Sequence, residues 1–211
     1  MKKSKFTLFL LCCLVTTFSL SSCLNSSSSS DNNYSTITKI QRVLYHAAID
    51  GSYSGYLYWY DPDNTTEKDS TALSWYISSS DSTITMPEFP VNLLSKFITN
   101  TTAKTILEAT PKQNLTMTYY IPTTELTEYI NKEYYRYGAY PTDNKMEFTY
   151  NGNNITINFG TSYTNYYVYY PMAVVYNSSY AQNIIIKSVE VNGTSCDVSN
   201  GFFWTIGSKQ E

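Results

Sequence analysis

The spacing of apolar residues changes at residue 50. Over residues 35–50 the apolar side chains recur at steps of three and four, which is the spacing of one face of an α-helix. They are Ile37, Ile40, Val43, Leu44, Ala47 and Ala48. Ser35 or Thr36 can cap the start of this helix, and Gly51 can end it. The sequence therefore predicts an N-terminal amphipathic helix.

From residue 51 onward, apolar and polar positions mostly alternate, as they do along half-buried β-strands. In the first such segment, 51–60, one face carries Tyr53, Gly55, Leu57 and Trp59, and the other carries Ser54, Tyr56, Tyr58 and Tyr60. Further strands are expected at 71–77, 82–86, 114–121, 145–150, 154–159, 166–170, 183–191 and 201–206. Asn151-Gly152 between two alternating arms predicts a hairpin turn.

Helical spacing returns in the middle of the chain. Residues 89–98 place Val91, Leu94 and Ile98 in helical register, and the segment 102–109 either extends this helix or forms a second one. Residues 123–135 have only weak helical spacing. We therefore expect an α+β fold that is mainly antiparallel β-sheet, with an N-terminal amphipathic helix and one or two further short helices. We expect a single domain over 35–211.

The first 22 residues have the pattern of a secretory leader. Three lysines and no acid precede an uncharged, mainly apolar run that ends at Leu20. The run is too short and too rich in hydroxyl groups for a membrane-spanning helix, which needs about 20 mostly apolar residues. Leu20-Ser21-Ser22-Cys23 resembles the bacterial lipoprotein signal, in which the chain is cut before the cysteine and the thiol receives a diacylglycerol. We therefore expect a signal peptide over 1–22 and lipidation at Cys23.

The segment 23–34 is expected to be a flexible, serine-rich tether behind the lipid. Residues 24–33 are almost entirely polar, so they cannot bury enough apolar surface to offset their ordering entropy. A flexible coil of this length has an average reach of about 17 Å. Two or three acyl chains hold a protein stably on a membrane, whereas one holds it only marginally. The expected partner is therefore a membrane, reached through the lipid anchor.

Charge and cysteine content exclude several classes of protein. Three of the 14 basic residues and none of the 17 acidic residues lie in the leader, so the mature chain carries 11 basic residues against 17 acidic ones, a net charge of −6. Such a chain lacks the lysines and arginines that phosphate contacts need, and we expect no nucleic-acid partner. Outside the leader and Cys23, only Cys196 remains. No intramolecular disulfide is therefore expected, and a free cysteine is usually buried.

No motif in the chain predicts catalysis. His46 is the only histidine, so any Ser-His-Asp or Cys-His arrangement would depend on it. One histidine and one available cysteine do not make a zinc or iron site. The acidic loop 61–69 lacks the glycine and glutamate of an EF-hand. We expect no catalytic residue, no metal and no cofactor. A carboxylate pair, as in glycosidases, remains open because such pairing is spatial.

The tyrosines are the best candidates for binding. Tyr56, Tyr58 and Tyr60 could project together from one strand face and stack on the apolar faces of sugars. Tyrosine is also a good strand residue that packs its ring and keeps its hydroxyl in water, so packing alone is the alternative. Three functions stay open: a non-catalytic protein that binds a ligand or partner such as a glycan, a structural or assembly subunit of an envelope complex, and a carboxylate-based glycosidase.

Three segments together carry a family resemblance. GSYSGYLYWYDPDN after the predicted helix, then MPEFPVNLLSKFI, then the hairpin EFTYNGNNITINFG resemble a family of small Bacteroidetes lipoproteins classed as a domain of unknown function. The Gly-x-Tyr-x-Gly strand and the Phe-Pro-Val segment are the specific parts of the match, which spans most of the mature chain. The resemblance implies a location in the cell envelope. It implies no activity or catalytic residue.

The resemblance also bears on localisation and modification. Leu24 rather than Asp follows the expected lipidated cysteine, so the inner-membrane retention signal is missing, and we expect the outer membrane, in either leaflet. Exported Bacteroidetes proteins are O-glycosylated at Asp-Ser/Thr followed by a small or apolar residue or threonine. Asp69-Ser70-Thr71 and Asp81-Ser82-Thr83 match this motif. The resemblance therefore implies O-glycosylation at Ser70 and Ser82.

Overall fold

The computed structural model describes residues 33–64, 66–163, 168–169 and 171–210. The predicted signal peptide, Cys23 and the tether up to residue 32 lie outside these ranges, as does most of the strand expected at 166–170. None of the helices among the described residues is both long and apolar enough to cross a membrane.

The fold is mainly antiparallel β-sheet, as the sequence predicts. Within the described ranges, eleven strands form one sheet whose main path is β12-β7-β5-β4-β3-β2-β15-β13-β9-β8, and β14 pairs with β13. The strands on the first part of this path are β12 (Met172–Tyr176), β7 (Tyr135–Pro141), β5 (Gln113–Tyr120), β4 (Thr83–Phe89), β3 (Lys68–Ser78), β2 (Gly51–Tyr60) and β15 (Phe202–Lys209). The rest are β13 (Ser179–Val191), β9 (Asn153–Phe159), β8 (Lys145–Tyr150) and β14 (Thr194–Asp197).

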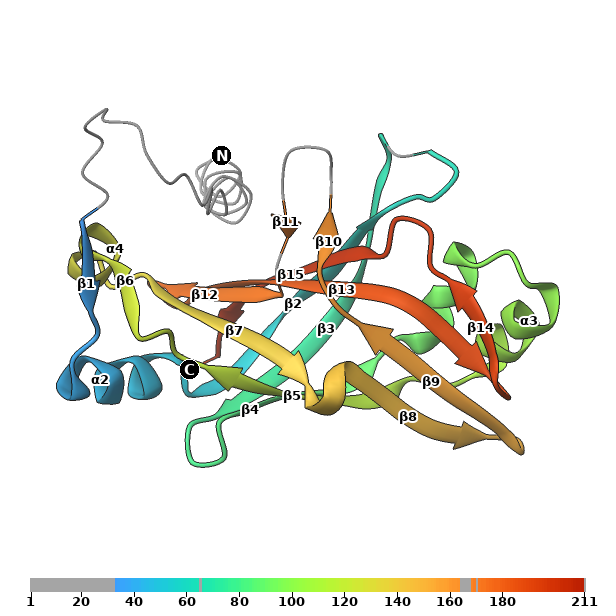
Figure 1. Ribbon diagram of the computed structural model, residues 1–211, viewed down its shortest axis with the longest axis horizontal. Helices are drawn as coiled ribbons and strands as arrows, with labels where there is room; N and C mark the ends of the chain where they lie inside the picture. The colour runs from blue at the N-terminus through green and yellow to red at the C-terminus, as the bar shows by residue number, and fades with distance from the viewer. Residues whose placement is uncertain (1–32, 65, 164–167, 170, 211) are drawn as a thin grey trace, which may run out of the picture.

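The sheet closes on itself at β12. This strand pairs with β7 on one side, where Ala173 faces Tyr137, and with β13 on the other, where Val174 faces Ala181. The result is a barrel-like sheet (Figure 1). Two small antiparallel pairs lie outside it: β1 (Tyr34–Thr36) with β6 (Thr124–Leu126), and β10 (Ser162–Tyr163) with β11 (Val168–Tyr169).

Strand β13 belongs to two parts of the structure. Its first half pairs with β12 and β15 within the closed ring, and its second half pairs with β9 and β14. The register against β9 shifts between Ile186 and Ser188, where the strand changes partners. The predicted Asn151-Gly152 hairpin joins β8 to β9. Both residues have positive φ, 47° and 76°, as this turn requires.

Aromatic side chains fill the interior of the ring. The alternation predicted for β2 is confirmed, since Tyr53, Leu57 and Trp59 are all buried. The Tyr53 ring stacks on that of Trp75 from β3, with centroids 5.9 Å apart. The predicted inward residues of β3 and β5 are buried as well: Leu73, Trp75, Ile77, Leu115, Met117 and Tyr119. Cys196 is free and buried, as expected.

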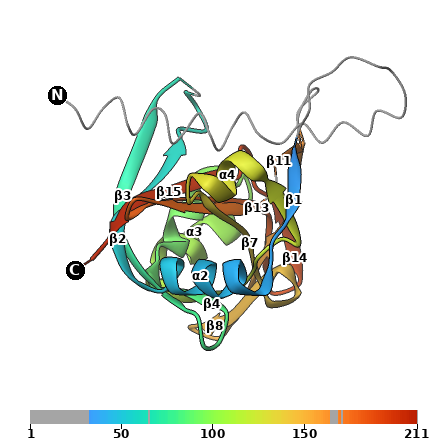
Figure 2. The same cartoon turned by 90° about the vertical axis from the view of Figure 1, so that its left-hand side faces the viewer.

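Helices lie at the two ends of the sheet. Helix α2 (Lys39–Ile49) crosses one end, and the 3₁₀ helix η1 (Val91–Phe97) and α3 (Thr101–Ala109) lie at the other (Figure 1). Figure 2 looks at the α2 end, with α2 in front and α3 behind. The shorter helices are α4 (Thr127–Asn131) and the 3₁₀ turn η2 (Thr142–Asn144).

Helix α2 differs from its prediction at its start. Residues 34–36, the end of the predicted tether and the start of the predicted helix, form β1 instead. Thr38, not Ser35 or Thr36, is the N-cap, because its side chain accepts from the Gln41 amide while the Gln41 side chain accepts from the Thr38 amide. This reciprocal capping box fixes the first turn.

The apolar face predicted for α2 points away from the core. The helix packs through Tyr45 and Ile49, which are buried. Ile40, Val43 and Leu44 are instead 76%, 67% and 56% exposed. Tyr45 and Ile49 lie one turn apart on the opposite side of the helix from these three residues, so the side that docks is not the side with the strongest apolar spacing.

Candidate binding site

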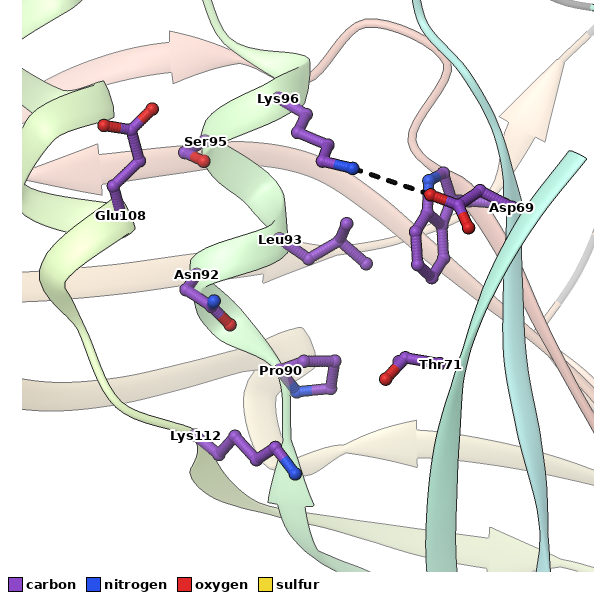
Figure 3. Close-up of a pocket in the computed structure, with 10 residues that line it drawn as sticks. Asp69, Thr71, Pro90, Asn92, Leu93, Ser95, Lys96, Glu108 and Lys112 are labelled. Carbon is purple, nitrogen blue, oxygen red and sulfur yellow. Dashed lines mark ion pairs between the residues drawn. The ribbon is translucent and has the colours of Figure 1, made fainter. Parts of the chain in front are cut away.

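A pocket lies where the ends of β2 and β3 meet η1 and the end of α3. Its volume is about 460 Å³, within the range typical of small-molecule sites. Its lining combines apolar groups with hydroxyl, amide and charged side chains: Trp59, Asp69, Thr71, Pro90, Asn92, Leu93, Ser95, Lys96, Glu108 and Lys112. Most of these side chains converge on one space in Figure 3.

The local sequence explains how the pocket forms. Pro90 has no backbone N–H to give to the sheet, so the chain leaves β4 and turns into η1, where Leu93 and Leu94 are buried. Asn100 caps α3, since its side-chain oxygen accepts from the Ala103 amide at 2.9 Å. The two helices thus place Asn92, Lys96 and Glu108 opposite the sheet.

Lys96 contacts both an acidic and an aromatic side chain of the pocket. Its ammonium lies 3.6 Å from the Asp69 carboxylate and 5.6 Å from the centroid of the Trp59 ring (Figure 3). Lys112, at the other side, pairs with Glu88 at 3.1 Å. All four charged side chains are about half exposed or more, and such exposed pairs contribute only about 0–1 kcal/mol each. Breaking the Lys96–Asp69 pair therefore costs little.

The pocket contains two carboxylates, one from β3 and one from α3. Figure 3 shows Asp69 and Glu108 on opposite sides, with Lys96 reaching toward Asp69. Glu108 is exposed, and Asp69 is both half exposed and ion-paired.

The three tyrosines predicted to bind lie together on the outer face of β2. Tyr56 and Tyr60 are 51% and 41% exposed, whereas Tyr58 is partly covered by the ammonium of Lys68, 5.0 Å from its ring centroid. The rings are not coplanar: those of Tyr56 and Tyr58 are tilted by 44°. Trp204 of β15, which is buried, stacks on Tyr58 at 5.9 Å. The face is aromatic and partly open, and its role in binding stays a prediction.

The predicted O-glycosylation residues have different surroundings. Ser70 is exposed but lies inside β3, paired with Tyr58, rather than in a turn. Ser82 lies in the turn between β3 and β4, is partly buried, and has a positive φ of 54°. Modification at either residue stays a prediction.

His46 takes part in packing. Its Nδ1 lies 2.7 Å from the Tyr119 hydroxyl, and its ring tilts against the Tyr119 ring. The described residues contain no group of three or more His, Cys, Asp or Glu side chains that could hold a metal ion.

Sequence reasoning did not find the pocket. It considered Asp69 as part of an acidic loop and of the Asp69-Ser70-Thr71 motif, and it placed Trp59 on one face of a strand. Five lining residues lie together in the segment 90–96, whose spacing predicted a helix, but no signal along the chain shows that this segment lies beside Trp59 and Asp69.

The fold and the pocket define a class: a closed antiparallel sheet with helices at both ends and a polar pocket beside one of them. The chain belongs to the family described as Domain of unknown function (DUF4840), whose model matches residues 48–191. This match covers β2 to β13, and it includes the residues that line the pocket. No match is found among curated proteins or among solved structures.

Proposed function

We propose that this protein is a non-catalytic, lipid-anchored protein of the cell envelope that binds a glycan in the pocket beside η1. The observation that carries the ligand part is the pocket itself, where the Trp59 ring, Pro90 and Leu93 lie beside an amide and several charged groups. Sugars present apolar ring faces and hydroxyl groups, and these two kinds of protein group match them. The leader and Cys23 support the envelope and outer-membrane part of the proposal.

The outer tyrosine face is the second candidate surface for the same ligand. Tyr56 and Tyr60 are open to solvent, but their rings are tilted and no groove encloses them. Base–ring stacking in nucleic-acid binders contributes about 1–3 kcal/mol, and a sugar on one ring should gain no more. Affinity from this face alone would be weak, so the pocket is the better supported site.

A glycan array with purified protein tests the proposal. Asn92→Ala removes an amide from the pocket, and we expect it to weaken the binding seen with the unmodified protein by about fivefold, because a neutral hydrogen bond contributes about 1 kcal/mol. Asp69→Ala removes a charged acceptor, and we expect it to weaken binding by about tenfold or more, because a hydrogen bond to a charged group contributes about 1.5–3 kcal/mol. Lys104→Ala is the matched control, since Lys104 is exposed on α3 outside the pocket lining. The melting temperature of each variant shows that the fold is kept.

A further variant separates the two surfaces. Replacing Tyr56, Tyr58 and Tyr60 together by serine leaves binding unchanged if the pocket is the site. If this variant loses binding and Asn92→Ala does not, the outer face is the site. If no glycan binds the unmodified protein, the ligand class is wrong.

The assembly and enzyme alternatives have less support. An assembly subunit would be favoured by a bare strand edge. The ring is closed at β12, and β8 and β14 lie at edges of the described sheet. Strand β8 carries the Lys145–Glu147 ion pair, and charged side chains disfavour edge-to-edge pairing. A glycosidase would need two carboxyl groups on either side of the bond that is cut, and in this pocket Asp69 is ion-paired with Lys96. Release of reducing sugar from a bound glycan would support the glycosidase alternative.

A further inference from the structure

The exposed side of α2 is an unusual surface. Ile40, Val43, Leu44 and Ala47 are all exposed, and their spacing places them on one stripe of the helix. Large apolar side chains gathered on a protein surface usually mark a contact with a partner or a membrane. The stripe makes no contribution to the core, because the opposite side of the helix packs through Tyr45 and Ile49.

We propose that this stripe rests on the lipid bilayer and that α2 lies in the membrane interface. The proposal rests on the lipid anchor of the proposed function. It concerns a second, non-covalent contact, made by a folded part of the chain.

The position of the tether supports a lipid occupant. Only the ten residues 24–33 separate Cys23 from β1, so even when fully extended they span at most about 35 Å. Strand β1 lies at the same end of the molecule as α2 and leads directly into it (Figure 1). An anchor at Cys23 therefore keeps this end of the molecule within the reach of the tether from the bilayer.

The geometry and charge of α2 also fit a bilayer. Helix α2 runs across the end of the molecule (Figure 2), and the stripe follows the helix along its length. The helix carries the exposed Lys39 and no acidic residue, so its open side brings no negative charge to a membrane surface. Arg42 donates to the carbonyl oxygens of Ile121 and Pro122, which fixes the helix to the segment between β5 and β6.

A protein partner fits this surface less well. The stripe is one helix wide, whereas a stable protein interface buries about 800 Å² on each partner. Tyr34 at the start of β1 is also 51% exposed beside the tether, where a tyrosine at a membrane interface can keep its ring in lipid and its hydroxyl in water.

A spin label tests the contact in the full lipidated protein, reconstituted in vesicles of phosphatidylethanolamine and phosphatidylglycerol. Val43→Cys places the label on the stripe, and Lys104→Cys places a matched label on an exposed site of α3 at the other end. Cys196 is buried, and the parent protein, labelled in parallel, gives the background. We expect the ratio of accessibility to oxygen over a water-soluble nickel complex to be several-fold higher at Val43 than at Lys104.

A second variant tests the stripe itself. Ile40→Ser with Leu44→Ser should lower the ratio at Val43 to that at Lys104. The melting temperature should stay unchanged, because both side chains are more than half exposed. Equal ratios for the Val43→Cys and Lys104→Cys labels, with Ile40 and Leu44 unchanged, would overturn the proposal. Spin–spin broadening between Val43 labels would also overturn it, because it would show a second copy on the stripe.

Intact mass separates this proposal from the lipid anchor. If the chain carries no lipid and its Val43 label still enters added vesicles, the membrane contact is supported and the lipid anchor is rejected. If the chain is lipidated and its Val43 label stays in water, the lipid anchor is supported and the contact of the stripe with the membrane is rejected. If the chain carries no lipid and its Val43 label stays in water, both the lipid anchor and the membrane contact are rejected.

Discussion

At the scale of single residues, the least expected group is a buried carboxylate near α2. Glu125 is only 3% exposed, and its Oε2 lies 3.4 Å from Nε of Arg136 while its Oε1 accepts from the Leu126 amide. Burial raises the pKa of Glu125 above its ordinary value by more than Arg136 and the amide lower it. Burial, with a smaller effect of the Glu125 charge, also raises the pKa of the nearby Tyr45 to about 12.

The pKa of Glu125 predicts a pH dependence of stability. Because the folded carboxyl holds its proton to a higher pH than the unfolded one, its contribution is fully present below about pH 4.5 and is lost as pH rises through the folded pKa. Glu125→Gln removes this dependence. We expect the free energy of unfolding of the unmodified protein, relative to that of the variant, to increase as the pH falls from 7 toward 4.5.

Urea unfolding of both proteins across this pH range measures the effect. The matched control is Glu128→Gln, which removes an exposed carboxylate from neighbouring α4. A stability difference between the unmodified protein and Glu125→Gln that does not change with pH would show that Glu125 titrates alike in the folded and unfolded chains.

At the scale of elements, two glycines set how closely β2 and β15 approach. Gly55 faces Gly207 across the strand pair. A Cβ on Gly55 would lie 2.1 Å from the Ile206 carbonyl oxygen and 2.5 Å from the Gly207 Cα. Backbone atoms cannot move aside as a flexible side chain can. The second glycine of the Gly-x-Tyr-x-Gly strand is therefore explained by the close approach of two backbones.

Gly55→Ala should destabilise the fold. Forcing a methyl group into a packed site typically costs about 1–3 kcal/mol, and here the clash is with backbone, so we expect the upper part of this range. Ser52→Ala on the same strand is the control, because Ser52 is exposed. Chemical unfolding of the two variants measures the difference. Equal stability would mean that β15 can move away from β2 without loss of pairing.

The same scale shows what the sequence can predict. Period-two alternation found β2, β3, β5, β8 and β9, because each has one face in the core. The strands expected at 82–86, 183–191 and 201–206 correspond to parts of β4, β13 and β15, although β13 is buried at consecutive positions. Within the closed ring the sequence did not predict β7 and β12: Gly138 and Pro141 interrupt the pattern in β7, and β12 has only five residues. Closure of the sheet depends on these two strands, so the ring was not predictable. The segment 89–98 had helical spacing but forms a 3₁₀ helix over 91–97, in which both Leu93 and Leu94 are buried.

The candidate site was predictable only in part. Alternation placed Tyr56, Tyr58 and Tyr60 on one face of β2, which the structure shows. It could not show that Trp204 stacks on Tyr58, or that η1 brings Lys96 over Trp59, because these contacts join segments far apart in the chain. The sequence also could not predict that the apolar stripe of α2 is exposed, because the spacing of apolar residues identifies an apolar face but not what covers it.

At the scale of the whole molecule, the two proposed contacts lie at opposite ends. Helix α2 crosses one end, and the pocket opens beside η1 and α3 at the other (Figure 1). A protein held at its α2 end would present the pocket away from the membrane. The anchor and the ligand site would then not compete for space.

The anchor itself gives the last prediction. The lipid on Cys23 is the strong attachment in this scheme, because each buried methylene contributes about 0.8 kcal/mol and two or three acyl chains carry many of them. The stripe of α2 offers only a few side chains, and these are already partly covered. In cells, Cys23→Ala should therefore leave the chain unprocessed or release it from the membrane fraction. The double variant Ile40→Ser, Leu44→Ser should stay in that fraction, because its lipid is intact. Fractionation and intact mass of both variants decide this, and a Cys23→Ala protein that is processed and still membrane-bound would show that the lipid is not what holds it.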